Sequence, residues 1–147
     1  MSKPVVIPFE TTLHVRDTCL CLHVQRAARA LARRFDEALR PVGLTNGQFS
    51  LLMSLNRPQP AGLGGVANLL AMDRTTLTAA LKPLERRGLL TIAPAPKDGR
   101  ARVLSLTPDG RAVLAQALPI WTREHGELDE ELGGGSEALR AGLKAIA

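Results

Sequence analysis

The chain has 147 residues, enough for one domain of ordinary size, and 45% of them are hydrophobic, which supports a real core and excludes a disordered chain. It contains no tyrosine, one tryptophan and three phenylalanines, so a nucleic-acid surface built on aromatic stacking is not expected. Its two cysteines cannot form a disulfide scaffold, and the sequence shows neither a signal peptide nor an apolar run of about 20 residues. We therefore expect a cytoplasmic protein without a membrane partner.

The formal net charge of +5 is distributed unevenly along the chain. Residues 74–111 hold eight basic and three acidic side chains, whereas residues 112–147 hold three basic and six acidic ones. A polyanion would therefore meet the middle of the chain. A solvated arginine-rich surface is the alternative interpretation, because net charge informs on association rather than on fold.

The first predicted element is a long amphipathic helix. Apolar residues recur at three- and four-residue steps over about residues 12–40, and Pro41 and Gly43 are suited to end the helix. Its opposite face carries arginines and acids, which favours a solvated surface on that side.

Two shorter helices are expected next. Thr45 and Gln48 stand at the N-cap and N3 positions of a capping box, so a second helix is predicted from there to about Leu55. Residues 63–71 predict a third helix, whose start is weakened by two consecutive glycines.

A fourth helix is predicted over residues 74–87. Asp73 is suited to cap it, because its carboxylate can accept a hydrogen bond from the N–H of Thr75 or Thr76. Gly88 is suited to end it in a Schellman motif. An internal proline removes one helical hydrogen bond, so we expect a kink there.

The next segment predicts a hairpin. Residues 90–92 and 102–106 are β-prone runs. Residues 93–101 between them contain prolines and a glycine, so we expect an irregular loop that presents Lys97 and Arg100 outward.

Helices complete the chain. Thr107 is expected to cap a fifth helix that runs to about residue 132 and bends at Pro119. Three glycines follow, and Ser136 is expected to cap a last helix that ends near Ile146.

Two short helices followed by a basic hairpin predict a DNA-reading unit. Threonines in the first turn of the fourth helix suit close approach to base edges, because their hydroxyls donate and accept and their methyl groups can meet thymine. Arg74 can reach guanine or a phosphate, and Arg100 suits the minor groove with Asp98 orienting it. The predicted DNA-contacting residues are Arg74, Thr75, Thr76, Thr78, Lys82, Lys97, Asp98, Arg100 and Arg102.

The sequence resembles a known family in these same segments. LTNGQFSLL (44–52), MDRTTLTAALKPLERRGLL (72–90) and KDGR (97–100) followed by LTPDGR (106–111) are similar to the MarR family of winged helix-turn-helix transcription regulators. The resemblance extends over about residues 15–146, and the block from the fourth helix to the hairpin is its most specific part.

The resemblance implies a mainly α fold with a small β-hairpin wing. Residues 1–147 would form a single domain, with a winged helix-turn-helix lobe that binds DNA over 44–107 and dimerisation helices over 12–41 and 108–147. It also implies that one contact to a base or a phosphate is absent at Ala79, where many relatives carry a polar or basic residue.

The functional expectation is a sequence-specific DNA-binding regulator, a homodimeric repressor that a small ligand releases. The apolar residues of the C-terminal helices independently favour a dimer, because the small DNA-reading lobe does not need them all. A dimer would place two recognition helices about 34–36 Å apart on a near-palindromic operator in double-stranded DNA.

The resemblance places an effector pocket between the dimerisation helices and the DNA-reading lobe. An arginine beside apolar walls would suit an aromatic or anionic effector. The candidate lining residues are Arg16, His23, Met53, Trp121 and His125.

Cys19 and Cys21 suggest an alternative trigger. On a helix they lie about 200° apart and face different ways, so they cannot pair with each other. Some members of the family sense peroxide through a cysteine on the first helix beside tyrosines, which this chain lacks. Packing is therefore favoured, and a thiol-based redox-sensing regulator is the alternative. A DNA-binding architectural protein without sequence preference is another alternative.

The chain shows no catalytic set. We find no nucleophile beside a base, no phosphate-binding glycine loop and no histidine or cysteine spacing typical of a metal site. We therefore expect neither enzymatic activity nor a cofactor.

Overall fold

The computed structural model describes residues 1–147 and divides into two units, residues 1–34 and 35–147. In the first unit, residues 1–8 form no helix or strand, and α1 (Phe9–Thr18) is followed by the beginning of α2 (Leu20–Leu39).

The chain breaks its first helix at Cys19, whose backbone is extended with φ −67° and ψ 111°. Just before the break, the Thr18 hydroxyl donates a hydrogen bond of 2.7 Å to the carbonyl of His14. Such a bond competes with the helical ladder and often bends a helix. The prediction of one continuous helix over residues 12–40 is therefore wrong, and α2 ends at Leu39.

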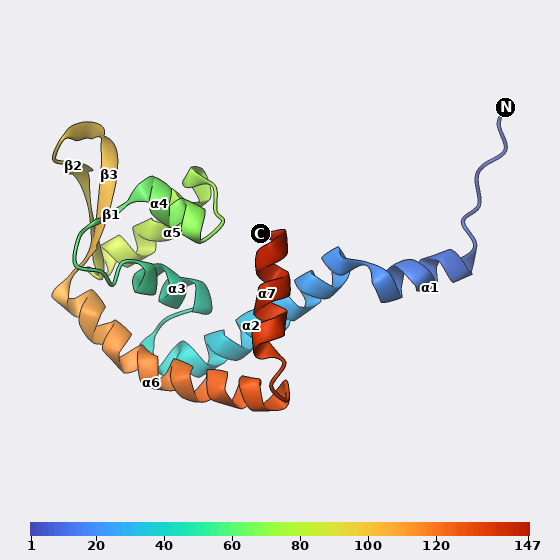
Figure 1. Cartoon of the computed structure of the whole chain (residues 1–147). Helices are drawn as coiled ribbons and strands as arrows, with labels where there is room; N and C mark the ends of the chain where they lie inside the picture. Colours follow the sequence, from blue (N-terminus) through green and yellow to red (C-terminus); the bar gives the residue numbers. More distant parts are fainter. The chain divides into compact units, whose positions relative to one another are not determined.

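The second unit holds the rest of the secondary structure. Figure 1 shows α3, α4 and α5 grouped beside a small sheet, from which the hairpin of β2 and β3 projects. This arrangement confirms the predicted fold class, mainly α with a small β-hairpin wing. After α2 the elements are η1 (Arg40–Val42), α3 (Asn46–Ser54), β1 (Ala61–Gly62), α4 (Leu63–Leu69), α5 (Arg74–Arg86), β2 (Leu90–Ala95), β3 (Asp98–Leu106), α6 (Pro108–Glu131) and α7 (Ser136–Ile146).

The sheet has three antiparallel strands in the order β1–β3–β2. The sequence did not predict β1, which has two residues and pairs Ala61 with Leu104. The expected irregular loop over residues 93–101 is also wrong, because β2 and β3 extend through it to a turn at Pro96 and Lys97. Since β2 is an edge strand, it tolerates prolines that cannot donate to a neighbouring strand.

The core of the second unit lies under α5. Leu77, Leu81 and Leu84 follow one another at helical spacing and are almost completely buried. Because these leucines fix the inner face of α5, its opposite face is left exposed. The largest fully buried side chains of the unit are Leu39, Leu52, Leu77, Leu81, Leu84, Leu90 and Leu104.

Most predicted helix starts are confirmed. Thr45 and Gln48 make both hydrogen bonds of the capping box, each 3.1 Å long. Thr107 accepts from the N–H of Gly110 at 3.0 Å, and its hydroxyl donates to the carbonyl of Gly88 at 2.5 Å. The start of α6 is therefore joined directly to Gly88, the residue after the C-cap of α5.

The expected cap at Ser136 is wrong. The N-cap residue of α7 is Gly135, and the Ser136 hydroxyl donates to the carboxylate of Asp129 at 2.6 Å instead. Both internal prolines are accommodated, since α5 continues through Pro83 and α6 continues through Pro119 with a gentle curve along its length (Figure 1).

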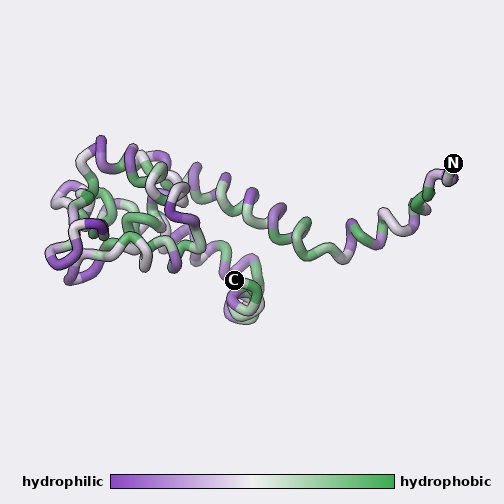
Figure 2. The backbone as a smooth tube through the Cα atoms, turned by 90° about the horizontal axis from the view of Figure 1, so that it is seen from above, coloured by the Kyte–Doolittle hydropathy of each residue, from purple (hydrophilic) through white to green (hydrophobic).

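Several helix faces present apolar side chains to solvent. On α7, Leu139, Leu143 and Ile146 are exposed at three- and four-residue steps, and α2 exposes Leu20 and Val24 in the same way. Figure 2 shows hydrophobic residues recurring along α1 and α2. None of the helices combines the length and the apolar character needed to cross a bilayer.

Candidate nucleic-acid interface

The N-terminal end of α5 is held by Asp73, as predicted. One carboxylate oxygen accepts from the backbone N–H of Thr76 at 2.7 Å, and the other accepts from the Thr76 hydroxyl at 2.9 Å. These bonds stabilise the charged form and lower the pKa of Asp73 below its ordinary value. The Thr76 hydroxyl therefore donates its hydrogen bond to the capping residue Asp73.

The C-terminal end of α5 is the predicted Schellman motif. Gly88 has φ +72°, its N–H donates to the carbonyl of Glu85 at 2.9 Å, and the N–H of Leu89 donates to the carbonyl of Leu84 at 3.0 Å. Both ends of α5 are therefore fixed by local hydrogen bonds.

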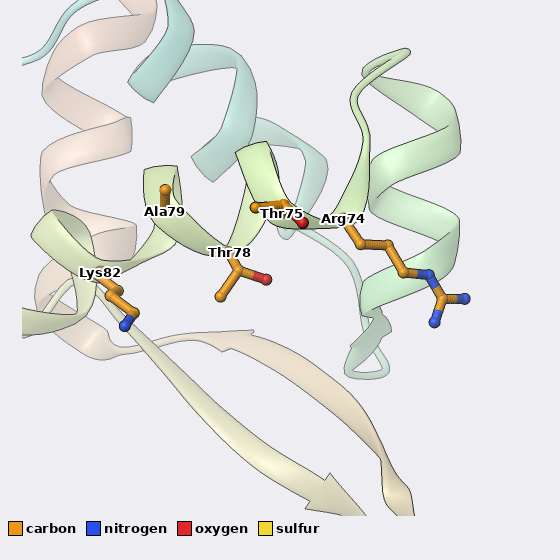
Figure 3. Close-up of a pocket in the computed structure, with 5 residues that line it drawn as sticks. All are labelled: Arg74, Thr75, Thr78, Ala79 and Lys82. Atoms are coloured by element: carbon orange, nitrogen blue, oxygen red, sulfur yellow. The ribbon is translucent and has the colours of Figure 1, made fainter.

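A shallow hollow of about 420 Å³ lies on the exposed face of α5. Figure 3 shows Arg74 and Lys82 at its two ends, with two threonines between them. The hollow presents two hydroxyls between two positive charges, and one alanine contributes only a methyl group. Its lining residues are Arg74, Thr75, Thr78, Ala79 and Lys82.

The hairpin contains a bulge next to its turn. Ala95 pairs with Asp98, but the preceding Pro94 pairs with Arg102, so residues 99–101 are left without partners on β2. The Asp98 carboxylate accepts from the backbone N–H of Arg100 at 3.1 Å. Asp98 therefore holds the backbone of the bulge rather than the Arg100 guanidinium that we expected it to orient.

Arg102 also braces this bulge. Its guanidinium donates to the carbonyl of Gly99 at 2.9 Å. The structure thus gathers four predicted contact residues on one hairpin, with Lys97 in the turn and Arg100 in the bulge, both exposed.

One basic residue at the end of α5 has a structural contact that the sequence did not reveal. The guanidinium of Arg87 donates to the carbonyl of Gly43 at 2.9 Å, 44 residues earlier in the chain. This hydrogen bond joins the end of α5 to the segment that precedes α3.

The candidate pocket residues fall into two groups, one in each unit. In the first unit, Arg16 and His23 line a cavity of about 320 Å³ together with Asp17, Leu22 and Arg26. The Arg16 guanidinium also pairs with Asp17 at 2.7 Å.

In the second unit, the rings of Trp121 and His125 lie 4.8 Å apart. Met53 lines a separate groove with residues of α6. Asp129 lies 3.2 Å from His125 and has a lowered pKa, caused first by the hydrogen bond from Ser136.

Both cysteines are free thiols, Cys19 half-buried and Cys21 exposed. The thiol-sensing alternative stays a prediction. The structure gathers no group of three or more histidine, cysteine, aspartate or glutamate side chains that could hold a metal ion.

The cap of α5 should make the stability of the protein depend on pH. The pKa of Asp73 lies below its ordinary value of 3.8 in the folded chain, so the cap stabilises the fold above that pH. This stabilisation is lost as the pH falls through the folded pKa. We expect the unfolding free energy of the wild type to decrease more steeply below pH 3.8 than that of Asp73→Asn. Urea unfolding over a pH series measures the difference, and parallel curves would contradict the assignment.

A capped helix with an exposed polar face, preceded by a second short helix and followed by a β-hairpin, defines a winged helix-turn-helix protein. Comparison with known proteins supports this class. The family model described as MarR family matches residues 44–101.

Solved structures of similar proteins cover most of the chain. The transcriptional regulator MosR of M. tuberculosis, crystallised in complex with DNA, is 35% identical and aligns over 86% of this chain and 92% of its own, with a TM-score of 0.79. The transcriptional repressor CouR, bound to a 23-mer DNA duplex, is 34% identical over 90% of this chain and 94% of its own, with a TM-score of 0.80. CouR has also been solved with p-coumaroyl-CoA.

A curated relative is the transcriptional activatory protein BadR of Rhodopseudomonas palustris, 31% identical over 97 residues. The match covers 64% of this chain but only 55% of BadR, so it spans little more than half of that relative. This chain belongs to the MarR family of transcription regulators.

Proposed function

We propose that the chain is a homodimeric repressor that binds a specific operator in double-stranded DNA and is released by a small ligand in the cytoplasm. The observation that carries the proposal is the exposed face of α5, where hydroxyls lie between two positive charges beside a basic hairpin.

The dimensions of α5 suit the major groove. Arg74 and Lys82 are eight residues apart, a rise of about 12 Å along the helix, which is close to the width of that groove. The two cations would bind phosphates, and Thr75 and Thr78 would read base edges between them. Thr76 would contribute its methyl group, because its hydroxyl is bonded to Asp73.

The hairpin would enter the adjacent minor groove. Its exposed Arg100 would be attracted by the negative potential there, and Lys97 would bind a phosphate as well. Asp98 and Arg102 would support this binding by holding the bulge.

The exposed apolar faces support a dimer. Leu139 and Leu143 on α7 and Leu20 and Val24 on α2 leave hydrophobic surface in water in a single chain. Burial of such faces against a second copy would stabilise both. Sedimentation should therefore show a dimer.

The cavity at Arg16 and His23 in the first unit and the ring pair of Trp121 and His125 in the second unit are two candidate ligand sites, each proposed by itself. Arginine suits an anionic group, and the rings suit an apolar one. The complex of CouR with p-coumaroyl-CoA supports a small-molecule effector for a related repressor. A ligand would release DNA only to the extent that it prefers a dimer shape unsuited to the operator.

The proposal is tested by selecting genomic fragments that bind the purified chain and comparing their affinity with that of random duplexes. We expect a selected near-palindromic site that binds at least about 10³-fold more tightly than random DNA. Equal affinities would instead indicate an architectural protein, and no binding at low salt would exclude DNA recognition. Competition with candidate anionic metabolites then tests release.

The threonine face should determine base preference. Thr75→Val and Thr78→Val keep the shape of the side chain but remove its hydroxyl, so discrimination at the base that each reads should fall by about 1–3 kcal/mol. A randomised-site selection measures the change. Thr122→Val, the same replacement on α6, is the matched control. A preference that stays the same in both α5 variants would contradict base reading by this face.

A further inference from the structure

A glycine of α4 lies directly under the Arg74 guanidinium. A Cβ atom added at Gly64 would lie 2.9 Å from Arg74 Nη2 and 3.8 Å from Cζ, closer than real Cβ atoms approach a neighbour. Gly64 is the second residue of α4, and Arg74 is the first residue of α5. The missing side chain therefore makes room for an arginine of the next helix.

The neighbouring glycine does not share this contact. A Cβ atom at Gly65 would meet no atom within 4 Å. Neither glycine has a positive φ, so the backbone itself does not require glycine at either position. Of these two glycines, only Gly64 lies against the side chain of another residue.

Arg74 takes this position without an ionic partner, since no carboxylate forms a salt bridge with it. Figure 3 shows its side chain extending away from the threonines of α5 and across α4. The guanidinium thus lies over α4 at the end of the hollow, and Arg74 is an exposed residue.

We propose that Gly64 is a positioning residue for DNA binding, which seats the Arg74 guanidinium on α4 and directs it to a backbone phosphate at the edge of the major groove. The inference rests on the proposed function and adds a residue and a role to it. An arginine held in its binding conformation loses less side-chain freedom on binding, and its planar fork suits a phosphate.

Gly64→Ala tests the proposal, with Gly65→Ala as the matched control. The clash at Gly64 falls on the end of a flexible side chain, so Arg74 can move aside and the fold is kept. Because alanine favours a helix over glycine, both variants should melt a few degrees higher than the wild type. Gly64→Ala should nevertheless bind the selected operator about 3- to 10-fold more weakly, whereas Gly65→Ala should keep the wild-type affinity.

A double-mutant cycle tests whether Gly64 affects DNA binding through Arg74. If Gly64 acts through Arg74, Arg74→Ala should weaken binding and reduce its salt dependence, and adding Gly64→Ala should weaken it no further. Equal operator affinities of Gly64→Ala and Gly65→Ala, or additive effects of Gly64→Ala and Arg74→Ala, would overturn the inference. Failure of the wild type itself to bind any operator would refute the proposed function instead.

Discussion

Gly110→Ala is expected to destabilise the protein by about 3 kcal/mol, the upper end of the usual cost of overpacking. A Cβ atom at Gly110 would lie 1.9 Å from the carbonyl oxygen of Leu89 and 2.9 Å from its carbonyl carbon. These are backbone atoms, and the same oxygen accepts a hydrogen bond from the N–H of Thr107 at 3.2 Å. The backbone of Leu89 therefore cannot move away from an alanine at position 110 without breaking its hydrogen bond to Thr107.

Gly126→Ala is the matched control for this prediction. Gly126 lies in the same helix, α6, and a Cβ atom there would meet no atom within 4 Å. This variant should gain up to about 1 kcal/mol, because alanine is the better helix former. Urea unfolding followed by circular dichroism measures both variants, and a midpoint for Gly110→Ala equal to that of the wild type would contradict the close approach.

Arg100→Ala is expected to weaken operator binding by at least about 10-fold, since hydrogen bonds to charged groups contribute about 1.5–3 kcal/mol each. The side chain is exposed in the bulge and Asp98 bonds to its backbone, so the substitution removes the guanidinium without removing the hydrogen bond that shapes the bulge. The dependence of the logarithm of affinity on the logarithm of salt concentration should become shallower by about 0.9 for each phosphate that the variant no longer neutralises.

The control for charge alone is Arg123→Ala. Arg123 is an exposed arginine of α6, 15 residues or about 22 Å along the helix from its junction with the wing. Titration of labelled operator over a salt series compares the two variants. Arg100→Ala with the same affinity and salt dependence as the wild type would contradict the insertion of the wing into DNA.

Local signals made the recognition helix predictable. The cap at Asp73 and the glycine at residue 88 depend on residues within one turn of each end of α5, so the sequence contains all the information that they require. The buried leucines recur at helical spacing and leave the face of Thr75 and Thr78 exposed. For these reasons the sequence predicted both the bounds of α5 and its outward face.

Features that depend on distant partners were not predictable in this way. β1 has only two residues and exists through its pairing with β3, about 40 residues later. The hydrogen bond of Arg87 to Gly43 and the space that Gly64 leaves for Arg74 also join separate elements. The sequence predicted that three threonines at the start of α5 contact DNA, but only the structure shows that the hydroxyl of Thr76 is bonded to Asp73.

The hydrogen bonds around Thr107 have a mechanical consequence for regulation. They connect the start of α6 to Gly88 and Leu89, the two residues that follow the C-cap of α5. In a dimer held by its terminal helices, a tilt of α6 would therefore pull on the C-terminal end of α5 through these bonds. An effector would then need no contact with the DNA-reading surface, because reorienting α6 alone would move both recognition helices out of register with the operator.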